Sequence, residues 1–258
     1  MKKKRVVYYK DEMNDEFSSA VITPRKIDGA YRYERDGFFG KMAHFFFYRI
    51  VAVPLAFLYL KIKFSNRIIG REKLGEAKNK PCFIYGNHTQ PTADALIPTF
   101  VTHPRDAFVI VHPANVSMPV LGRITPYIGA LPLPDNMEAA RNFARVIEKR
   151  AGEKKPIFIY PEAHIWPYYT GIRPFSEQSF CYPIKYRTPV FCFTNVYKKR
   201  KFCVPRIETY VDGPFYADET LPHAERKKAL RDAVYDKMKE RSLLSDTEYI
   251  EYRKESGI

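Results

Sequence analysis

The sequence has few cysteines and glycines and a single tryptophan, and it lacks the motifs of several common enzyme classes. Four cysteines occur in 258 residues and none stands in a CxxC pair, so zinc-ribbon and thioredoxin-like sites have no support. The twelve glycines form neither GxGxxG nor GxxxxGK[ST], which excludes the Rossmann fingerprint and the P-loop. The absence of GxSxG disfavours an α/β-hydrolase.

Acidic residues are outnumbered, with 29 Asp and Glu against 43 Lys and Arg, and the net charge is +14. This excess favours anionic partners such as phosphate-bearing substrates, anionic lipid or nucleic acid. The cysteines stand among apolar or aromatic residues, which is typical of free buried thiols and indicates a reducing compartment. The chain turns polar after its first basic residues, where the apolar core of a signal peptide would begin, so we expect no secretion signal.

Composition divides the chain into three parts. Residues 1–37 are polar, carry charges of both signs, and predict a solvated tail. Residues 38–64 are dense in aromatic and aliphatic side chains, but the uninterrupted apolar part, Ile50–Leu60, has 11 residues, whereas a spanning helix needs about 20. Pro54 is expected to kink or divide a helix there. With lysines beside it, the segment predicts an interfacial membrane anchor, and a core helix over the sheet is the alternative. Residues 65–258 are expected to form one domain.

Within that domain, short apolar runs alternate with helical patterns. This alternation predicts an α/β fold with a central, mostly parallel sheet flanked by helices. The runs that predict strands are Cys82–Tyr85, Phe108–Val111, Ala130–Leu133, Ile157–Tyr160, Val190–Val196 and Arg206–Val211. The clearest helical patterns are Met137–Arg150 and Ala224–Arg241.

A polar loop follows the first of these strands and carries a candidate catalytic pair. Asn87 and His88 come directly after Gly86, and Asp94 falls in the first turn of a helix expected to start near Thr92. Ligand sites in open α/β sheets lie at the carboxyl ends of the strands. A carboxylate there can fix the tautomer of an imidazole, whose other nitrogen can then accept a proton from an alcohol. The pattern favours His88 as general base and Asp94 as its orienting partner; a histidine that only holds the loop is the alternative.

A second polar loop follows the strand Ile157–Tyr160 and carries Glu162, His164 and the only tryptophan, Trp166. Because the carboxyl ends of parallel strands share one edge of a sheet, both loops are expected to face one cleft. A proline-bounded turn with a surface glutamate is the alternative.

Together these segments resemble motifs of the PlsC-type glycerophospholipid acyltransferases, which include lysophosphatidic acid acyltransferase. The motifs occur in the family's order over about residues 80–195: Asn87-His88 with Asp94, then Tyr160-Pro161-Glu162, then the strand Pro189-Val190-Phe191-Cys192-Phe193. The family's first motif is NH within HxxxxD, and its third resembles FPEGTR. The resemblance implies an α/β acyltransferase fold and membrane association, which we expect at the cytoplasmic face. It also implies transfer of a fatty acyl group from acyl-CoA or acyl carrier protein to a hydroxyl of a lysophospholipid, as in 1-acylglycerol-3-phosphate O-acyltransferase.

The chain departs from the family mainly where the acceptor phosphate would bind. Five residues, not four, separate His88 from Asp94, and Ala163-His164-Ile165 stands where the family has Gly-Thr-Arg. The stretch Tyr127–Asp135, which corresponds to the second motif, contains no arginine. Both expected phosphate-binding arginines are therefore missing, and Arg123, Arg173 and Lys185 are candidates to replace them.

The expected substrate-binding residues are Asn87, Glu162, His164, Arg123 and Arg173. Backbone amides near Asn87 or at the following helix start are expected to stabilise the oxyanion. His164, Trp166, Tyr168 and Tyr169 would place an aromatic wall beside Glu162, which favours a neutral or cationic head group over lysophosphatidic acid.

Two other functions compete with acyl transfer. One is a metal-dependent hydrolase that uses His88, Asp94, Glu162 and His164 as ligands. The other is a basic membrane- or RNA-binding domain without catalysis, which would use Lys198–Lys201 and Arg226–Lys228. For the acyltransferase we expect no metal, no cofactor and no nucleic-acid partner.

Overall fold

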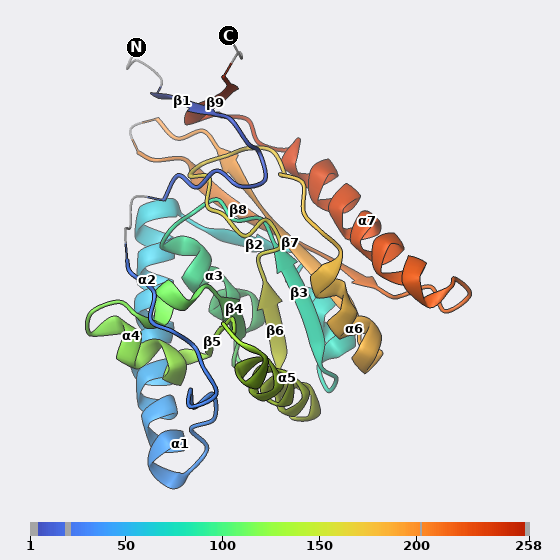
Figure 1. Cartoon of the computed structure of the whole chain (residues 1–258). Coiled ribbons are helices and arrows are strands. Elements are labelled where there is room, and N and C mark those ends of the chain that lie inside the picture. The colour runs from blue at the N-terminus through green and yellow to red at the C-terminus, as the bar shows by residue number, and fades with distance from the viewer. Residues whose placement is uncertain (1–4, 19–21, 202, 256–258) are drawn as a thin grey trace.

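The computed structural model describes residues 5–18, 22–201 and 203–255 (Figure 1). Within these residues seven strands form the central sheet in the order β2-β8-β7-β3-β6-β4-β5. Their bounds are Arg67–Ile69 (β2), Cys82–Gly86 (β3), Phe108–Val111 (β4), Ala130–Pro132 (β5), Pro156–Ile159 (β6), Val190–Lys198 (β7) and Arg206–Phe215 (β8). Only the β7–β8 pair is antiparallel. The predicted α/β class with a mostly parallel sheet is confirmed.

Helices cover both faces of this sheet. Their bounds are Phe38–His44 (α1), Val53–Phe64 (α2), Ala93–Thr102 (α3), Leu121–Ile124 (α4), Met137–Gly152 (α5), Cys181–Tyr186 (α6) and His223–Ser242 (α7), with short 3-10 helices at Arg71–Ala77, Pro113–Val116, Thr125–Ile128 and Gln178–Phe180. Asn136 caps the start of α5, because its side chain accepts a hydrogen bond from the amide of Ala139 at 2.8 Å.

Two apolar cores lie on the two faces of the sheet, because side chains alternate along each strand. Phe83 and Tyr85 of β3 pack in the core formed with α5, α6 and α7. Cys82 and Ile84 pack in the core formed with α2 and α3. The strands buried on both faces explain the continuous apolar runs in the sequence.

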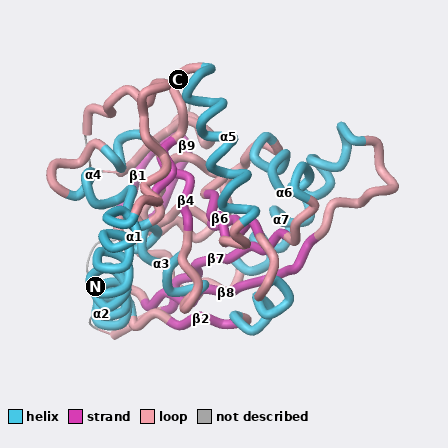
Figure 2. The backbone as a smooth tube through the Cα atoms, turned by 90° about the horizontal axis from the view of Figure 1, so that it is seen from below, coloured by secondary structure: helices cyan, strands magenta, loops and turns pink. Residues whose placement is uncertain are grey.

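The apolar segment forms one helix over Phe38–Phe64, which is long and apolar enough by length and composition to cross a membrane. The prediction of a stretch too short for this, divided at Pro54, is wrong. Within this continuous helix a π-helical stretch, Phe45–Ala52, joins α1 to α2 just before Pro54. The change of helix type there accommodates the proline, which has no amide hydrogen to donate. This helix lies on the side of the molecule opposite α6 and α7 (Figure 1 and Figure 2).

The N-terminal segment packs onto the domain, so the prediction of a solvated tail is wrong for its described part. Strand β1 (Arg5–Tyr9) pairs in parallel with β9 (Ile250–Lys254), and the two lie side by side in Figure 1. Ile27 and Tyr33 are buried in the core beside α5. Scattered aromatic and aliphatic side chains in a polar stretch provide this burial without a periodic signal. Residues 1–4 and 19–21 of the predicted tail lie outside the described residues.

Candidate active site

His88 and Asp94 lie together at the carboxyl end of β3. His88 lies in the loop between β3 and α3, and Asp94 lies in the first turn of α3. The imidazole Nδ1 is 2.9 Å from Asp94 Oδ2. With Nδ1 donating to the carboxylate, the other ring nitrogen, Nε2, is left as a proton acceptor. The His88 side chain is 18% exposed, whereas that of Asp94 is 1% exposed. A partly exposed imidazole held by a buried carboxylate is chemically suited to accept a proton at Nε2.

The Asp94 carboxylate is fixed by further hydrogen bonds. Oδ2 accepts from the amides of Thr89 and Gln90, both at 2.7 Å, and Oδ1 accepts from the Asn195 side chain at 3.3 Å. Burial raises the pKa of the Asp94 carboxyl above its ordinary value, although the hydrogen bonds from His88 and the two amides act in the opposite direction. The extra residue relative to HxxxxD is absorbed in this turn, and its amides bind the carboxylate.

The His88 ring rests on Tyr160, at the end of β6. The two rings stack with centroids 4.5 Å apart and planes 23° apart, and the Tyr160 hydroxyl donates to the backbone carbonyl of Asp94. Tyr160 in turn meets the edge of Phe193 from β7. A Cβ at Gly86 would lie 2.1 Å from the Phe193 ring, so glycine is required there for this stack to form. Tyr160 stands in the resembling motif, but its position in the sequence does not predict this contact.

Glu162 and Arg173 form a buried ion pair beside the dyad. Both side chains are fully buried, with 3.5 Å between Arg173 Nη2 and Glu162 Oε2. Glu162 also accepts hydrogen bonds from the His88 and Arg173 amides, each at 3.2 Å. Burial raises the pKa of the Glu162 carboxyl, and the Arg173 charge opposes this shift. Glu162 therefore ties the loop after β6 to the loop that carries His88.

The two ends of the chain brace this loop around Trp166. The indole is fully buried, stacks on Tyr252 with centroids 4.9 Å apart, and donates to the Asp15 carbonyl at 2.8 Å. The Arg173 guanidinium lies 5.0 Å from the indole centroid. The predicted aromatic wall for a substrate head group is therefore wrong for Trp166, because the ring is covered by the N-terminal and C-terminal segments.

The other predicted binding residues are placed differently. Asn87 is buried, donates to the Asn195 carbonyl at 3.1 Å and accepts from the Asn195 amide at 2.8 Å, so its side chain holds β3 to β7. His164 Nδ1 lies 3.4 Å from Glu16. Arg123, on α4, is exposed, and no hydrogen bond or ion pair among the described residues joins it to the dyad. Substrate contacts by these residues stay predictions.

Arg173 and Lys185 differ as candidates to replace the missing arginines. The Arg173 guanidinium is bound to other groups of the protein: besides Glu162, it donates to the carbonyls of Glu12 and His164. Lys185, on α6, is exposed, with its ammonium 5.1 Å from the ring of Tyr186. The Arg173 guanidinium is therefore not free to bind a phosphate.

The geometry bears on the expected oxyanion site and on the alternative of a metal site. The amides of His88, Thr89 and Gln90 all donate to carboxylates of the protein, so the expected oxyanion site cannot use these three. Over the described ranges there is no group of three or more His, Cys, Asp or Glu side chains that could hold a metal ion. Of the four ligands of the hydrolase alternative, His88 and Asp94 bind each other, Glu162 pairs with Arg173, and His164 lies beside Glu16.

Ala163 adopts a conformation that favours glycine. Its φ is 63°, and the family's motif has glycine at this position. A side chain in this left-handed region costs about 1–2 kcal/mol. We therefore expect Ala163→Gly to raise the free energy of unfolding by about 1 kcal/mol, after the greater flexibility of glycine in the unfolded chain is subtracted.

Chemical denaturation of wild type and variant measures this. Ala140→Gly, in the interior of α5, is the control and should lower stability by about 1 kcal/mol. Equal losses for both variants would contradict a strained backbone at residue 163.

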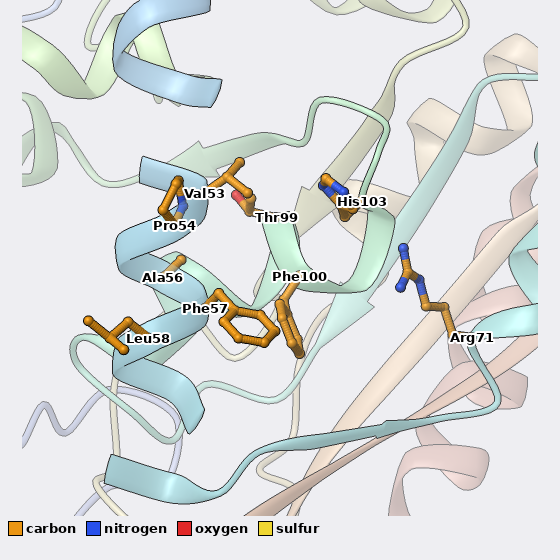
Figure 3. Close-up of a pocket in the computed structure, with 9 residues that line it drawn as sticks. All are labelled: Val53, Pro54, Ala56, Phe57, Leu58, Arg71, Thr99, Phe100 and His103. Carbon is orange, nitrogen blue, oxygen red and sulfur yellow. The ribbon is translucent and has the colours of Figure 1, made fainter. Parts of the chain in front are cut away.

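An apolar groove lies between α2 and α3. Its cavity is about 590 Å³, and Figure 3 shows Phe57 of α2 beside Phe100 of α3, with their ring centroids 5.4 Å apart. Arg71 and His103 stand at one side of it (Figure 3). The volume falls within the range of small-molecule sites, about 300–1,000 Å³. The helix α3 that forms one wall begins beside the dyad, at Ala93.

The α/β fold is similar to that of a solved acyltransferase. The crystal structure of the 1-acyl-sn-glycerophosphate (LPA) acyltransferase PlsC from Thermotoga maritima is similar, with a TM-score of 0.54 and 16% sequence identity over 81% of each chain. At this identity the likeness is one of fold. No protein-family profile and no curated protein sequence matches the chain.

Proposed function

We propose that this protein is an O-acyltransferase that moves a fatty acyl group from an acyl thioester to a hydroxyl of a lysophospholipid or related lipid. The observation that carries the proposal is the His88–Asp94 contact at the carboxyl edge of the sheet. Its support is twofold: the motif order in the sequence, and a fold similar to PlsC.

In the proposed mechanism His88 Nε2 accepts the proton of the acceptor hydroxyl as its oxygen attacks the thioester carbonyl. The C–O bond forms, the C–S bond breaks, and the imidazolium returns the proton to the leaving thiolate. Asp94 stabilises the imidazolium and keeps its Nδ1–H oriented. Neither a covalent enzyme intermediate nor a cofactor is needed, and the donor is acyl-CoA or acyl carrier protein.

Glu162 and Arg173 serve this site as positioning residues. Glu162 holds the His88 amide, and Arg173 neutralises Glu162 and fastens the loop that carries it. We further propose that the groove between α2 and α3 receives the acyl chain, since its lining is apolar and the helix α3 links it to Asp94.

A direct test is the release of coenzyme A from acyl-CoA by the purified protein. The proposal requires release that depends on added lysolipid. Release at the same rate without lysolipid would indicate a thioesterase and would contradict acyl transfer.

The helix Phe38–Phe64 supports membrane association. Tyr48, Leu60 and Phe64 bury one side of it against the domain. Its other side exposes large apolar side chains: Phe38, Phe39, Met42, Phe45, Phe46, Ile50, Leu55, Phe57, Leu58 and Ile62. The helix packs on the domain through a few buried residues. Its apolar outer face and the basic residues at its end suit an interfacial position at the cytoplasmic face.

We expect the variant Phe38→Ser/Phe39→Ser/Phe46→Ser to bind phosphatidylcholine vesicles more than tenfold more weakly than wild type. Burial of a phenylalanine contributes about 1.5–3 kcal/mol, and the three rings are at least half exposed in the protein, Phe38 by 77%. Sedimentation with vesicles at 1 M salt, where the Debye length is about 3 Å, removes most charge attraction.

The matched control is Tyr216→Ser/Leu243→Ser, which changes exposed apolar residues far from this helix in sequence. The control should bind like wild type. Undiminished binding by the triple variant would contradict an anchor at this face.

A further inference from the structure

A second cavity lies at the opposite edge of the sheet from His88. Its volume is about 410 Å³, and it is bounded by α1, by the end of α5 and by the amino ends of β4 and β6. Five of its lining residues are lysine or arginine and three are aspartate or glutamate. The proposed reaction uses none of them, so the cavity calls for a separate explanation.

Each carboxylate of this cavity already lies beside at least one cationic side chain. Asp106 lies 2.5 Å from Arg49, 2.9 Å from Lys155 and 3.6 Å from His44. Burial alone would raise the pKa of the Asp106 carboxyl, but the hydrogen bonds from His44 and Lys155 and the nearby charges hold it well below its ordinary value. The charged form of Asp106 is therefore favoured, and it lies beside two cations, Arg49 and Lys155.

Asp36 is paired in the same way. It binds Lys149, and Arg150 Nη2 lies 3.2 Å from its Oδ1. Arg150 Nη1 binds Glu153 at 2.7 Å. Each carboxylate that lines the cavity thus has a cationic partner. Because the lining cations outnumber the lining carboxylates, the cavity keeps an excess of positive charge.

Donor groups that can take an anion remain in the cavity. Lys41, on α1, has no hydrogen bond or ion pair through its ammonium in the part of the chain that the structure describes. Arg35 donates one hydrogen bond, to the Arg32 carbonyl at 2.7 Å, and faces the Tyr127 ring at 5.3 Å. The Nε of Arg150 is buried without a hydrogen-bond partner, in a side chain that is 9% exposed. Guanidinium and ammonium donors of this kind suit phosphate oxygens.

The cavity borders the proposed membrane face. Gly40, Lys41 and His44 line it from α1, and Phe38, Phe39, Met42 and Phe45 of the same helix expose more than half of their side-chain surface. If these rings enter the acyl boundary, the cavity sits at the depth of the head groups.

We propose that this cavity binds the phosphate of an anionic phospholipid head group, through Arg35, Lys41 and Arg150. The inference rests on the proposed membrane association, but not on catalysis. Lipid phosphate would add specificity for anionic membranes to an anchor that is otherwise apolar.

The test is vesicle sedimentation of wild type and of Arg35→Gln/Lys41→Gln, with phosphatidylcholine alone or mixed with phosphatidylglycerol. Wild type should prefer the mixed vesicles. The double variant should lose about thirtyfold of binding to mixed vesicles, which corresponds to about 1 kcal/mol for each cation. Its binding to phosphatidylcholine should be unchanged.

The control is Lys227→Gln/Lys228→Gln on α7, which removes the same charge on the opposite side of the molecule (Figure 1). The control should keep the preference for phosphatidylglycerol. An equal loss in both variants would mean diffuse charge attraction and would overturn the cavity site. If the double variant fails to fold, Lys41→Gln alone applies the same test with about a fivefold loss expected.

A soluble probe separates the lipid from a free phosphate compound. We expect sn-glycerol 3-phosphate to raise the melting temperature little and to compete weakly with mixed vesicles. Strong stabilisation by this probe, lost in the double variant, would overturn the lipid assignment in favour of a soluble ligand. Wild type that binds both vesicle types equally would overturn this inference alone, whereas wild type that binds neither would also contradict the proposed membrane association.

Discussion

His88→Ala should lower the rate of lysolipid-dependent coenzyme A release by about 10²–10⁴-fold while the protein stays folded, because removal of a general base typically costs this much. The His88 side chain is partly exposed and packs on one face of Tyr160, so its loss removes the proton acceptor without opening the core. Circular dichroism and the melting temperature establish that the variant is folded.

Two further variants sharpen this test. Asp94→Asn should also lower the rate, since an amide stabilises the imidazolium poorly, whereas His223→Ala at the exposed start of α7 should leave it unchanged. Wild-type turnover by folded His88→Ala protein would rule out this histidine as the base.

Glu162→Ala should destabilise the protein by about 3–5 kcal/mol, because it leaves the fully buried Arg173 guanidinium without its carboxylate. The loop that holds the His88 amide would loosen at the same time, so activity should fall even under conditions where the variant is folded. Denaturant titration measures the stability, and the rate of coenzyme A release measures the second effect.

The double variant Glu162→Gln/Arg173→Met provides the control for an ion pair. Replacement of both charges removes the uncompensated cation, so this protein should be more stable than Glu162→Ala. If Glu162→Ala is as stable as wild type, the pair does not hold the loop.

The dyad was predictable because its determinants are local. Asn87 and His88 follow a continuous apolar strand, and Asp94 opens the next helix, so strand end, turn and helix start bring the two side chains together. The sequence also predicts the sheet, since strands buried on both faces must be apolar throughout. The motif resemblance added the loop at Glu162 as a partner, and in the structure Glu162 lies beside His88.

Residues that depend on distant contacts could not be assigned in this way. Arginine side chains are usually exposed, so the sequence does not predict that Arg173 is buried. In the fold it is surrounded by Glu162, the Glu12 carbonyl and Trp166. The β1–β9 pair joins residues at opposite ends of the sequence. Neither arrangement leaves a periodic pattern in the sequence, because each depends on contacts between segments that are distant along the chain.

The most direct measurement is mass spectrometry of the lipids that the purified protein makes from an isotopically labelled acyl-CoA or acyl carrier protein and a panel of lysolipids. We predict a diacyl lipid that carries the label in ester linkage, made by wild type and absent with His88→Ala. Among the acceptors, lysophosphatidic acid should not be preferred over a neutral or zwitterionic lysolipid. Both arginines expected from the family's motifs are absent, and Arg173, a candidate to replace them, is committed to Glu162. Label recovered only as free fatty acid, or no labelled lipid with any acceptor and either donor, would contradict acyl transfer as the function of this site.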